Sequence, residues 1–449
     1  MVLSSKKVCV VGAGVAGLAS AHELRREGHD VTVMEQSSGV GGQWLYDPAT
    51  DAGDPLGVAG AHSSIYASLR LNTPREAVAF SDVPFFPSND GTGDARRYPC
   101  HGEFLRYIRD FCNAFELMDT VRLNTKVLRV AMEPRNDDDD VRWVVRCAKQ
   151  GEVVATTEEE VFDAVVVAVG QYTQPRLPKI NGMDKWRRRQ MHSHSYRVPD
   201  SFSGEVVVVV GCHESGKDIA LELRAVAREV HVSVKSMDDR FGWLALRAAQ
   251  IDRLCEDGRV VFADGSCVVA DAVIYCTGYN YSFPLLDTAG HVTVDDNRVG
   301  PLFEHTFPPA LAPSLSFVGI PKLVVVPRFF EAQARWVAQV LSGRRLLPAP
   351  EEMMRAAEEY HRAREMAGVP KHQTHRIAFD FELCDEFGEK CCGFPRMEEW
   401  KKDLILSSIR SSRDNAESCR EDYHDSELVL EGLRSHGWLT GRPPQHDRG

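Results

Sequence analysis

The sequence predicts an α/β protein with two Rossmann-like βαβ units, the second inserted into the domain that the first one begins. Residues 8–35 run through an apolar segment, a glycine-rich turn, a helical pattern and a second apolar segment, and residues 205–235 repeat that order. Two further apolar segments with glycine ends, 164–170 and 271–278, follow the two units. We expect each of them to return the chain from one domain to the other, within parallel, buried sheets.

The first unit contains a dinucleotide-binding fingerprint. Gly12, Gly14 and Gly17 follow the strand at 8–11 in GxGxxG spacing. The first glycine permits the tight turn, the second lets a pyrophosphate approach bare backbone, and the third allows close packing of helix on strand. The phosphates are expected at the helix N-terminus, where N–H groups are unpaired. The predicted binding loop is Gly12, Ala13, Gly14, Val15, Ala16 and Gly17.

The second strand of this unit, 31–34, ends at Glu35, which stands 23 residues after Gly12. An acid at this place accepts hydrogen bonds from ribose hydroxyls. The glycine turn alone would be a weak signal, but strand, helix, second strand and acid together favour nucleotide binding over a plain turn. Because an acid suits a ribose with free hydroxyls, the first site fits FAD or NAD.

The second unit has a degraded form of the same fingerprint. Gly211 and Gly216 keep the first and last positions, whereas His213 replaces the middle glycine and Glu214 adds a carboxylate near the expected pyrophosphate. Like charges 4 Å apart repel by ~1 kcal/mol in water and ~4 kcal/mol at an effective dielectric of 20, so Glu214 must point away or weaken the ligand. It could also be a plain N-terminal helix charge. The predicted loop is Gly211, Cys212, His213, Glu214, Ser215 and Gly216.

Lys235 ends the second strand of this repeat, 24 residues after Gly211, where the first unit has Glu35. A base suits a ribose 2′-phosphate, so the second site fits NADP. The alternative is a solvated lysine at the end of a strand. With Pro175, Pro178 and residues 279–284 as extended linkers, we expect a FAD-binding domain at 1–175, an NADPH-binding domain at 176–280, the second FAD part with C-terminal helices at 281–440, and a polar tail at 441–449.

Composition narrows the possible partners. The net charge of −12 argues against affinity for nucleic acid or an anionic membrane. The sequence runs from MVLSSKK directly into the first strand, with no apolar run of ~20 residues, so we expect no signal peptide, no membrane anchor and a cytoplasmic location. Asp137 to Asp140 are expected to form a solvated hairpin loop.

The twelve cysteines are scattered. Cys9, Cys147 and Cys276 stand singly in apolar strands, as buried thiols of a reducing compartment do. Cys391 and Cys392 are adjacent, and no pair has zinc or redox spacing. The sequence therefore predicts neither a metal site nor a redox-active disulfide.

Several segments resemble the flavin-containing monooxygenases, and among them the plant branch that includes the glucosinolate S-oxygenases. The GGQW stretch at 41–44 resembles the GGxW flavin segment, and residues 63–76 resemble the stretch with the catalytic asparagine, here Asn72. Residues 276–284 resemble the TGY…FP linker, and residues 299–313 and 329–343 resemble the C-terminal part of the plant proteins. The resemblance implies that Gly42, Gln43 and Trp44 contact FAD.

The sequence departs from the family at two places. The signature FxGxxxHxxx(F/Y) aligns with residues 186–196, where His192 and Tyr196 match but Trp186 and Arg188 replace the phenylalanine and the glycine. Plant members also lack the middle glycine of the second fingerprint, whereas Glu214 has no such parallel. These departures bear on NADPH binding more than on the fold or on FAD. We expect His192 and His194 to be structural.

The resemblance implies the chemistry. In this family NADPH reduces FAD, O2 adds at flavin carbon 4a, and the resulting hydroperoxide oxidises a soft nucleophile in a pocket that must exclude water. The resemblance assigns Asn72 and retained NADP⁺ the hydrogen bonds that preserve this intermediate, because an amide donates and accepts without delivering a proton. Without the family, Asn72 would be interpreted as a turn residue before Thr73 and Pro74.

Glu331 and Gln333 begin a C-terminal helix whose N-terminus could face the flavin pyrimidine and stabilise negative charge there. An amphipathic surface helix is the alternative. We therefore predict an FAD- and NADPH-dependent monooxygenase that transfers oxygen from O2 to a small molecule, with a thioether sulfur as the expected acceptor. The alternatives are an amine N-hydroxylase, an uncoupled NADPH oxidase, motivated by Arg188 and Glu214, or a flavin-binding protein without catalysis.

Overall fold

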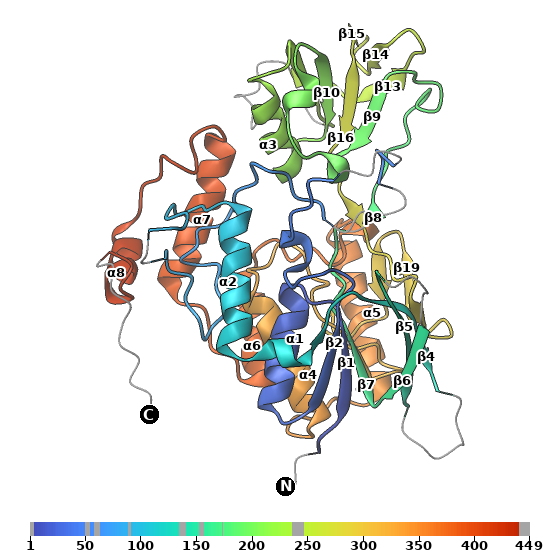
Figure 1. Cartoon of the computed structure of the whole chain (residues 1–449), viewed down its shortest axis with the longest axis vertical. Helices are drawn as coiled ribbons and strands as arrows, with labels where there is room; N and C mark the ends of the chain where they lie inside the picture. The colour runs from blue at the N-terminus through green and yellow to red at the C-terminus, as the bar shows by residue number, and fades with distance from the viewer. Residues whose placement is uncertain are drawn as a thin grey trace.

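The computed structural model describes residues 4–49, 54–57, 63–88, 91–133, 141–151, 157–172, 174–235 and 247–439. The predicted loop at 137–140 and the tail at 441–449 lie outside these residues. Two lobes stand one above the other (Figure 1), with β1 and α1 in the lower lobe and β10 and α3 in the upper lobe. Each of the two predicted βαβ units therefore lies in a lobe of its own.

The lower lobe is built on a parallel five-stranded sheet of order β21-β7-β1-β2-β3. Its strands are β1 (Lys7–Val11), β2 (Asp30–Met34), β3 (Val121–Arg122), β7 (Ala164–Val167) and β21 (Leu315–Phe317). The strand β21 comes from the C-terminal part of the chain, after the second unit. Helices α1 (Val15–Arg26) and α4 (Arg328–Leu341) share the apolar core on one face of this sheet.

The upper lobe repeats this plan in a parallel sheet of order β12-β11-β10-β16-β9. Its strands are β9 (Arg189–His192), β10 (Val206–Val210), β11 (Glu229–Ser233), β12 (Arg247–Ala248) and β16 (Ala272–Tyr275), with helix α3 (Glu214–Leu223) following β10. The helix ends at Leu223, where the chain continues into i→i+3 turns in which Val226 N donates to Leu223 O. The small antiparallel sheet of β13 (Ile251–Leu254), β14 (Arg259–Phe262) and β15 (Cys267–Val269) covers the lobe.

The two crossings between the lobes lie side by side. β8 (Gln174–Pro175) and β17 (Tyr279–Asn280) pair as an antiparallel ribbon. The upper sheet is thus inserted between strands of the lower sheet, as the sequence predicts, while the residue limits of the domains stay predictions.

The remaining elements surround the lower lobe. The second sheet there, of order β18-β4-β5-β6, contains β4 (Thr125–Met132), β5 (Trp143–Lys149), β6 (Thr157–Phe162) and β18 (Leu286–Asp287), and a hairpin joins β19 (Thr293–Asp295) to β20 (Arg298–Gly300). The helices are α2 (His101–Ala114), α5 (Pro350–Met366), α6 (Phe381–Cys392), α7 (Glu399–Asp414) and α8 (Glu427–Ser435). Figure 1 shows that α7 reaches from the lower lobe toward α3.

Three observations concern features that the sequence is not expected to form: a membrane span, a disulfide and a metal site. In the described ranges, no helix has the length and apolar character that a membrane crossing needs. All twelve cysteines are free thiols, and Cys9, Cys147 and Cys276 are buried. Within the same described residues, no three His, Cys, Asp or Glu side chains gather as a metal site would require.

Candidate active site

A cavity of about 740 Å³ runs between the lobes, from the first fingerprint to the N-terminus of α3. Its volume falls within the range of ~300–1,000 Å³ that small-molecule and cofactor sites occupy. Of the predicted site residues, its wall contains Gly12, Gly14, Val15, Ala16, Glu35, Gly42, Gln43, Trp44, Asn72, Glu214 and Ser215. The cavity thus brings residues of both βαβ units to one space.

The first fingerprint has the geometry that its glycines predict. Gly12 has a φ of +101°, and a Cβ there would lie 2.8 Å from the Ala168 carbonyl oxygen. A Cβ on Gly17 would lie 1.8 Å from the Gly12 oxygen, so helix and strand approach as closely as glycine allows. Gly14 is different, because its backbone is extended and a Cβ would meet Gly42 Cα at an ordinary 3.5 Å. The fold requires the outer two glycines, while the middle one leaves the cavity floor bare.

The GGQW segment closes against this loop. Gly41 N donates to Ala13 O at 3.0 Å, which brings the short 3₁₀ turn at Gly42–Trp44 beside the fingerprint. A Cβ on Gly42 would lie 2.8 Å from Gly14 Cα. The Trp44 ring packs edge-on against Phe104 with centroids 4.7 Å apart. Bare backbone therefore faces the cavity from two sides.

Glu35 is held by the backbone around it. Its side chain is buried, with Ala13 N donating to Oε2 and Ser37 N donating to Oε1, both at 2.7 Å. A carboxylate is an acceptor with about four lone-pair positions on its two oxygens, which suits the hydroxyls of a ribose. Because Glu35 also lines the cavity, its position agrees with the predicted role.

Asn72 is exposed to the cavity at the junction of the lobes. Its amide Nδ2 donates to Glu214 Oε2 at 3.4 Å, and Thr73 Oγ1 donates to its Oδ1, also at 3.4 Å. Ser408 Oγ of α7 lies 3.5 Å from the Asn72 carbonyl oxygen. These long contacts come from three parts of the chain, so Asn72 lies where the lower lobe, α3 and α7 meet.

Glu214 lines the cavity and so does not point away from it, and the other expected outcome, that it weakens an anionic ligand, stays a prediction. Its carboxylate lines the cavity, and Lys217 Nζ lies 3.2 Å from Oε2. The Lys217 side chain is buried and also donates to Ser412 Oγ at 2.7 Å. Since the ammonium offsets the carboxylate, the N-terminus of α3 does not present an unopposed negative charge.

The other predicted site residues lie outside the cavity wall. His213 is exposed to solvent, and Lys235 is exposed just after β11. A Cβ on Gly211 or Gly216 would meet backbone oxygen at 2.7 or 2.0 Å, so both serve close packing. The predicted site residues that do not line the cavity are Ala13, Gly17, Gly211, Cys212, His213, Gly216, Lys235 and Gln333. Their roles toward a coenzyme stay predictions.

Gln333 supports the cavity from behind. Its side chain is fully buried, with Oε1 accepting from Gly319 N at 3.2 Å and Nε2 donating to Thr306 Oγ1 at 2.9 Å. Gly319 and Phe330 line the cavity, but Gln333 does not. The helix turns this residue toward the 306–319 loop, behind the cavity wall, and its role toward FAD stays a prediction.

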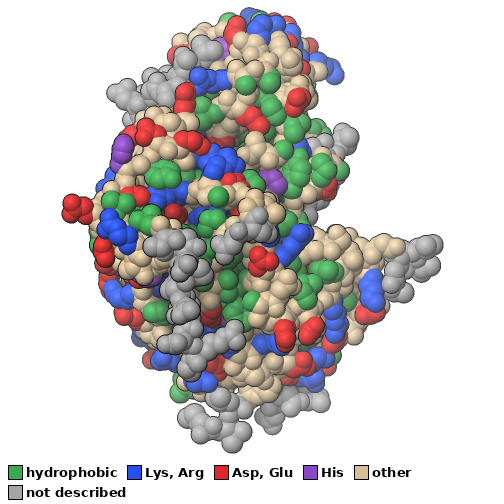
Figure 2. Space-filling model, turned by 60° about the vertical axis from the view of Figure 1, so that its left-hand side comes forward, with side chains coloured by type: hydrophobic (Ala, Val, Ile, Leu, Met, Phe, Trp, Pro, Cys, Tyr) green, Lys and Arg blue, Asp and Glu red, His purple; other side chains and the backbone are tan. Residues whose placement is uncertain are grey.

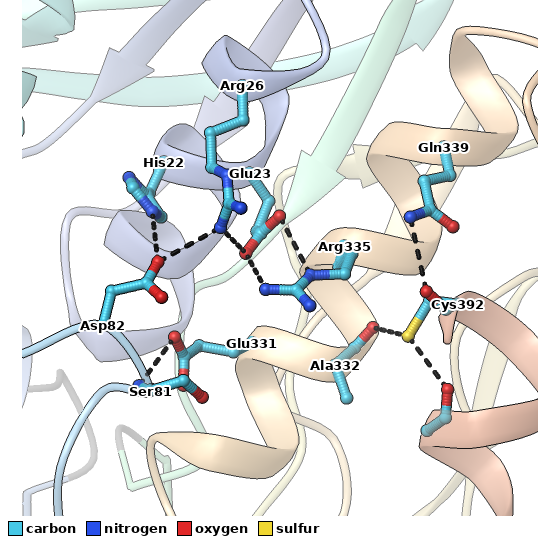
Figure 3. A network of polar contacts seen from close by, with 11 residues as sticks. His22, Glu23, Arg26, Ser81, Asp82, Glu331, Ala332, Arg335, Gln339 and Cys392 are labelled. Atoms are coloured by element: carbon cyan, nitrogen blue, oxygen red, sulfur yellow. Dashed lines mark hydrogen bonds and ion pairs between the residues drawn. The ribbon is translucent and has the colours of Figure 1, made fainter. Parts of the chain in front are cut away.

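Glu331 belongs to a buried polar network between α1 and α4 (Figure 3). Ser81 N donates to its Oε2 at 2.9 Å and to its Oε1 at 3.1 Å. Burial raises the pKa of Glu331 to about 7, although the Ser81 hydrogen bonds oppose this shift. Nearby, Arg335 of α4 pairs with Glu23 of α1 at 3.0 Å. The network joins the first βαβ unit to the helix whose first turn borders the cavity.

The departures from the family signature lie away from the cavity. Arg188 Nη1 donates to Ala270 O at 2.8 Å and pairs with Asp271 at 3.1 Å. Gly258 makes room for it, because a Cβ there would lie 2.2 Å from Arg188 Nε. Burial and the neighbouring His194 lower the pKa of His192 to about 4, as suits a neutral structural histidine. Arg188 thus ties β9 to the small sheet.

The cavity residues that were not predicted from the sequence include Tyr66, Asp218, Arg420 and Arg70. Tyr66 and Asp218 meet across the lobes, with the Tyr66 hydroxyl donating to Asp218 Oδ2 at 3.0 Å. Arg420, from the loop after α7, donates to the same oxygen at 2.8 Å. Arg70 also lines this end of the cavity. Nothing in their spacing indicates a site, because three distant segments bring them together.

Known proteins place these observations in a family. The family model described as "Flavin-binding monooxygenase-like" matches residues 5–248 and 241–397. The chain belongs to this family. Flavin-containing monooxygenase FMO GS-OX-like 9 of Arabidopsis thaliana is 51% identical over 96% of each chain, and FMO GS-OX-like 8 of the same plant is 52% identical over 96% of this chain and 95% of its own.

Solved structures agree with this assignment. S-allyl-L-cysteine S-oxygenase from Allium sativum superimposes with a TM-score of 0.90 at 41% identity, over 97% of this chain and 99% of that one. Tmm from Pelagibacter, at 24% identity and a TM-score of 0.78 over 94% of each chain, shares the fold. The protein is a flavin-containing monooxygenase, an oxidoreductase that uses FAD, NADPH and O2 on a small molecule.

The residues of the first unit fit FAD. Bare backbone at Gly14 and Gly42 leaves room for a pyrophosphate at the N-terminus of α1, and Glu35 offers acceptors to a ribose. The larger part of the cavity wall by the first turn of α4 is apolar, including Val78, Phe104 and Phe330. An apolar lining of this kind suits the faces of a flat aromatic ring such as an isoalloxazine.

Proposed function

We propose that this monooxygenase is an S-oxygenase, which transfers one oxygen atom from O2 to the sulfur of a small thioether. NADPH supplies the two electrons: thioether, O2, NADPH and H⁺ give sulfoxide, water and NADP⁺. The observation that carries the proposal is the Asn72 amide, exposed in the cavity that residues of both βαβ units line. The garlic relative, an S-oxygenase of S-allyl-L-cysteine, supports sulfur as the oxidised atom.

Different residues of the chain would bind FAD, orient the reacting groups and exclude water. The loop from Gly12 to Gly17 and the α1 N-terminus would bind the FAD pyrophosphate, and Glu35 would bind the ribose. Bound FAD supplies the oxygen activation. Asn72 would orient the reacting groups, because its neutral amide donates and accepts hydrogen bonds without releasing a proton. Apolar side chains such as Val325 and Phe330 would exclude water.

The NADPH site is proposed at the N-terminus of α3, with Ser215 in the cavity wall and Lys217 beside Glu214. Lys235, after β11, would bind the 2′-phosphate. This agrees with an NADPH-binding domain at 176–280 between two parts of an FAD-binding domain. No observation favours amine oxidation or loss of turnover, since Arg188 lies outside the cavity wall. The cytoplasmic location stays a prediction.

Three quantities measured in the same reactions test this function: NADPH consumed, hydrogen peroxide released and oxygenated product formed. The acceptors are a set of thioethers and a set of tertiary amines, with oxygen uptake as an independent record. We expect sulfoxide to account for most of the NADPH with a thioether. Amine oxide formed in preference to sulfoxide, or peroxide equal to NADPH with every acceptor, would contradict the proposal.

A further inference from the structure

The end of the cavity beside Asn72 contains a cluster of Tyr66, Asp218 and Arg420, which we name the Arg420 cluster. All three residues line the cavity together with Asn72. Tyr66 precedes Asn72 in the lower lobe, Asp218 lies on α3 of the upper lobe, and Arg420 lies in the loop after α7. Asp218 lies one helical turn after Glu214, the hydrogen-bond partner of Asn72, so the cluster lies near the residue that is expected to face the reacting atoms.

Arg420 has unused hydrogen-bonding capacity. Its Nη2 donates to Asp218 Oδ2 at 2.8 Å, and its side chain is 18% exposed. Within the described part of the chain, its Nε and Nη1 have no hydrogen-bond partner. A guanidinium has five N–H donors in a planar fork, which matches the two oxygens of a carboxylate. Arg420 thus presents an anchored cation with free donors to the cavity.

The other two residues hold Arg420 in place. The Tyr66 hydroxyl donates to the same Asp218 oxygen at 3.0 Å. Burial and then the charge of Asp218 raise the pKa of Tyr66 well above its ordinary value, so it remains a phenol that donates. Because Asp218 accepts from both sides, the guanidinium is fixed before a ligand arrives, which reduces the entropy lost on binding.

The charges at this end of the cavity cancel. Arg70 pairs with Glu421, Lys217 with Glu214, and Arg420 with Asp218. Figure 2 likewise shows basic and acidic side chains next to each other on the surface where the lobes meet. Three ion pairs leave no net charge at this end of the cavity, so long-range attraction favours neither an anion nor a cation. This end suits a ligand that is itself neutral overall but carries separated charges.

We propose that Arg420 binds the carboxylate of a zwitterionic α-amino acid whose side chain contains the thioether that this enzyme oxidises. This inference rests on the proposed function and extends it to a substrate class. The carboxylate would take the free Nε and Nη1 donors, and the side chain would extend past Asn72 toward the apolar part of the cavity. Arg420 is then a residue that determines specificity.

Two other roles for Arg420 make different predictions. If it binds a phosphate of NADPH, its loss weakens NADPH for every substrate. If it merely ties α3 to the C-terminal segment, its loss lowers stability and affects all substrates alike. The proposed role alone predicts a loss that follows the substrate carboxylate.

The test uses three thioethers of nearly equal size with the holoenzyme: S-methyl-L-cysteine, its deaminated analogue 3-(methylthio)propanoate and its decarboxylated analogue 2-(methylthio)ethylamine. In the wild type, kcat/KM for sulfoxide formation should be highest for the amino acid. In Arg420→Gln, KM should rise about tenfold or more for the two carboxylates, as loss of a charged hydrogen bond predicts. The amine should change by less than about threefold.

Two variants serve as controls. Arg410→Gln removes an exposed arginine of α7 that pairs only loosely with Asp403, at 3.7 Å, and should leave all three substrates unchanged. Arg420→Lys keeps the charge beside Asp218 and should recover part of the binding of the amino acid. The KM for NADPH and the rate of anaerobic flavin reduction without substrate should not change in any variant.

Several results would overturn the inference: equal losses for all three thioethers, a raised KM for NADPH, or a wild-type enzyme without preference for the amino acid. The last comparison needs no variant, so it decides the matter even if Arg420→Gln does not fold. Failure of the proposed function looks different. In that case the wild type would consume NADPH but form sulfoxide from none of the three compounds. The inference about Arg420 would then be contradicted together with the proposed function.

Discussion

The two βαβ units share a backbone but differ in what faces the ligand. Gly12 and Gly211 have φ angles of +101° and +95°, and a Cβ on either would lie within 2.8 Å of a carbonyl oxygen. Gly17 and Gly216 approach the first glycine of their own loop equally closely. The middle residues, Gly14 and His213, both have extended backbone. The fold therefore imposes the outer glycines in both units, whereas it leaves the middle position open.

The difference lies in the neighbours of that middle position. Gly14 faces Gly42 across the cavity floor, while the His213 side chain is exposed to solvent. At the strand ends, Glu35 is buried and bonded to two backbone amides, and Lys235 is exposed. The first unit thus has a close-fitting site lined by bare backbone, which suits a resident cofactor. The second unit is more open, as a coenzyme that must enter and leave requires.

The largest effect is expected from valine at the glycines of the first unit. Gly17→Val should abolish folding, because its Cβ would overlap the Gly12 carbonyl oxygen at 1.8 Å. Gly14→Val should fold and lack FAD, since its Cβ meets no atom closer than 3.5 Å but the side chain fills the cavity floor. Circular dichroism and the flavin-to-protein absorbance ratio measure both outcomes. A Gly14→Val protein that is yellow with bound FAD would contradict the claim that Gly14 serves ligand binding and not folding.

The next effect concerns coenzyme choice in the second unit. Lys235→Ala should raise KM for NADPH about tenfold and leave KM for NADH nearly unchanged, because the 2′-phosphate loses a charged partner. Lys185→Ala, another lysine of the upper lobe and outside the cavity wall, is the control. Equal changes for the two coenzymes would mean that Lys235 does not bind the phosphate.

A smaller effect is expected at Glu214. Glu214→Asn should lower KM for NADPH by about two- to fivefold, since one negative charge near the pyrophosphate is removed at a partly exposed place. Lys217, 3.2 Å away, already offsets much of that charge, which limits the gain. Stopped-flow measurement of flavin reduction, titrated with NADPH and with NADH, determines this change in affinity. Weaker binding in the variant would show that Glu214 helps NADPH.

A separate effect, on stability rather than on binding, is expected from the buried polar network between α1 and α4 that contains Glu331. The pKa of Glu331, about 7, lies above its ordinary 4.5, so the folded state favours the protonated form. That stabilisation is fully present below pH 4.5 and is lost as the pH rises through 7. Glu331→Gln should therefore gain about 1–3 kcal/mol relative to wild type between pH 5 and 8.

Denaturant unfolding at several pH values measures this difference. Glu399→Gln, a substitution at an exposed glutamate of α7, should follow the wild-type profile throughout. If Glu331→Gln also follows it, the buried carboxyl does not titrate in this range.

The comparison also explains which features could be predicted from the sequence. Glu35 and the outer glycines follow from local spacing, because turn, strand and helix fix their positions within one βαβ unit. The helix that contains Gln333 could be predicted, but its partners Gly319 and Thr306 could not, since side-chain direction around a helix depends on packing. Arg420 gave no signal at all. It meets Asp218, 202 positions away in the chain, only because α7 folds back toward α3.

The central claim is that Asn72, in the cavity that residues of both units line, couples NADPH oxidation to sulfur oxidation. The most direct measurement is the ratio of sulfoxide formed to NADPH consumed by Asn72→Asp, at matched flavin content. The variant keeps the size of the side chain and replaces a neutral amide with a group that repels negative charge or delivers a proton. We predict that flavin reduction survives, the ratio falls at least fivefold and hydrogen peroxide rises. An Asn72→Asp enzyme with the wild-type ratio would contradict this account.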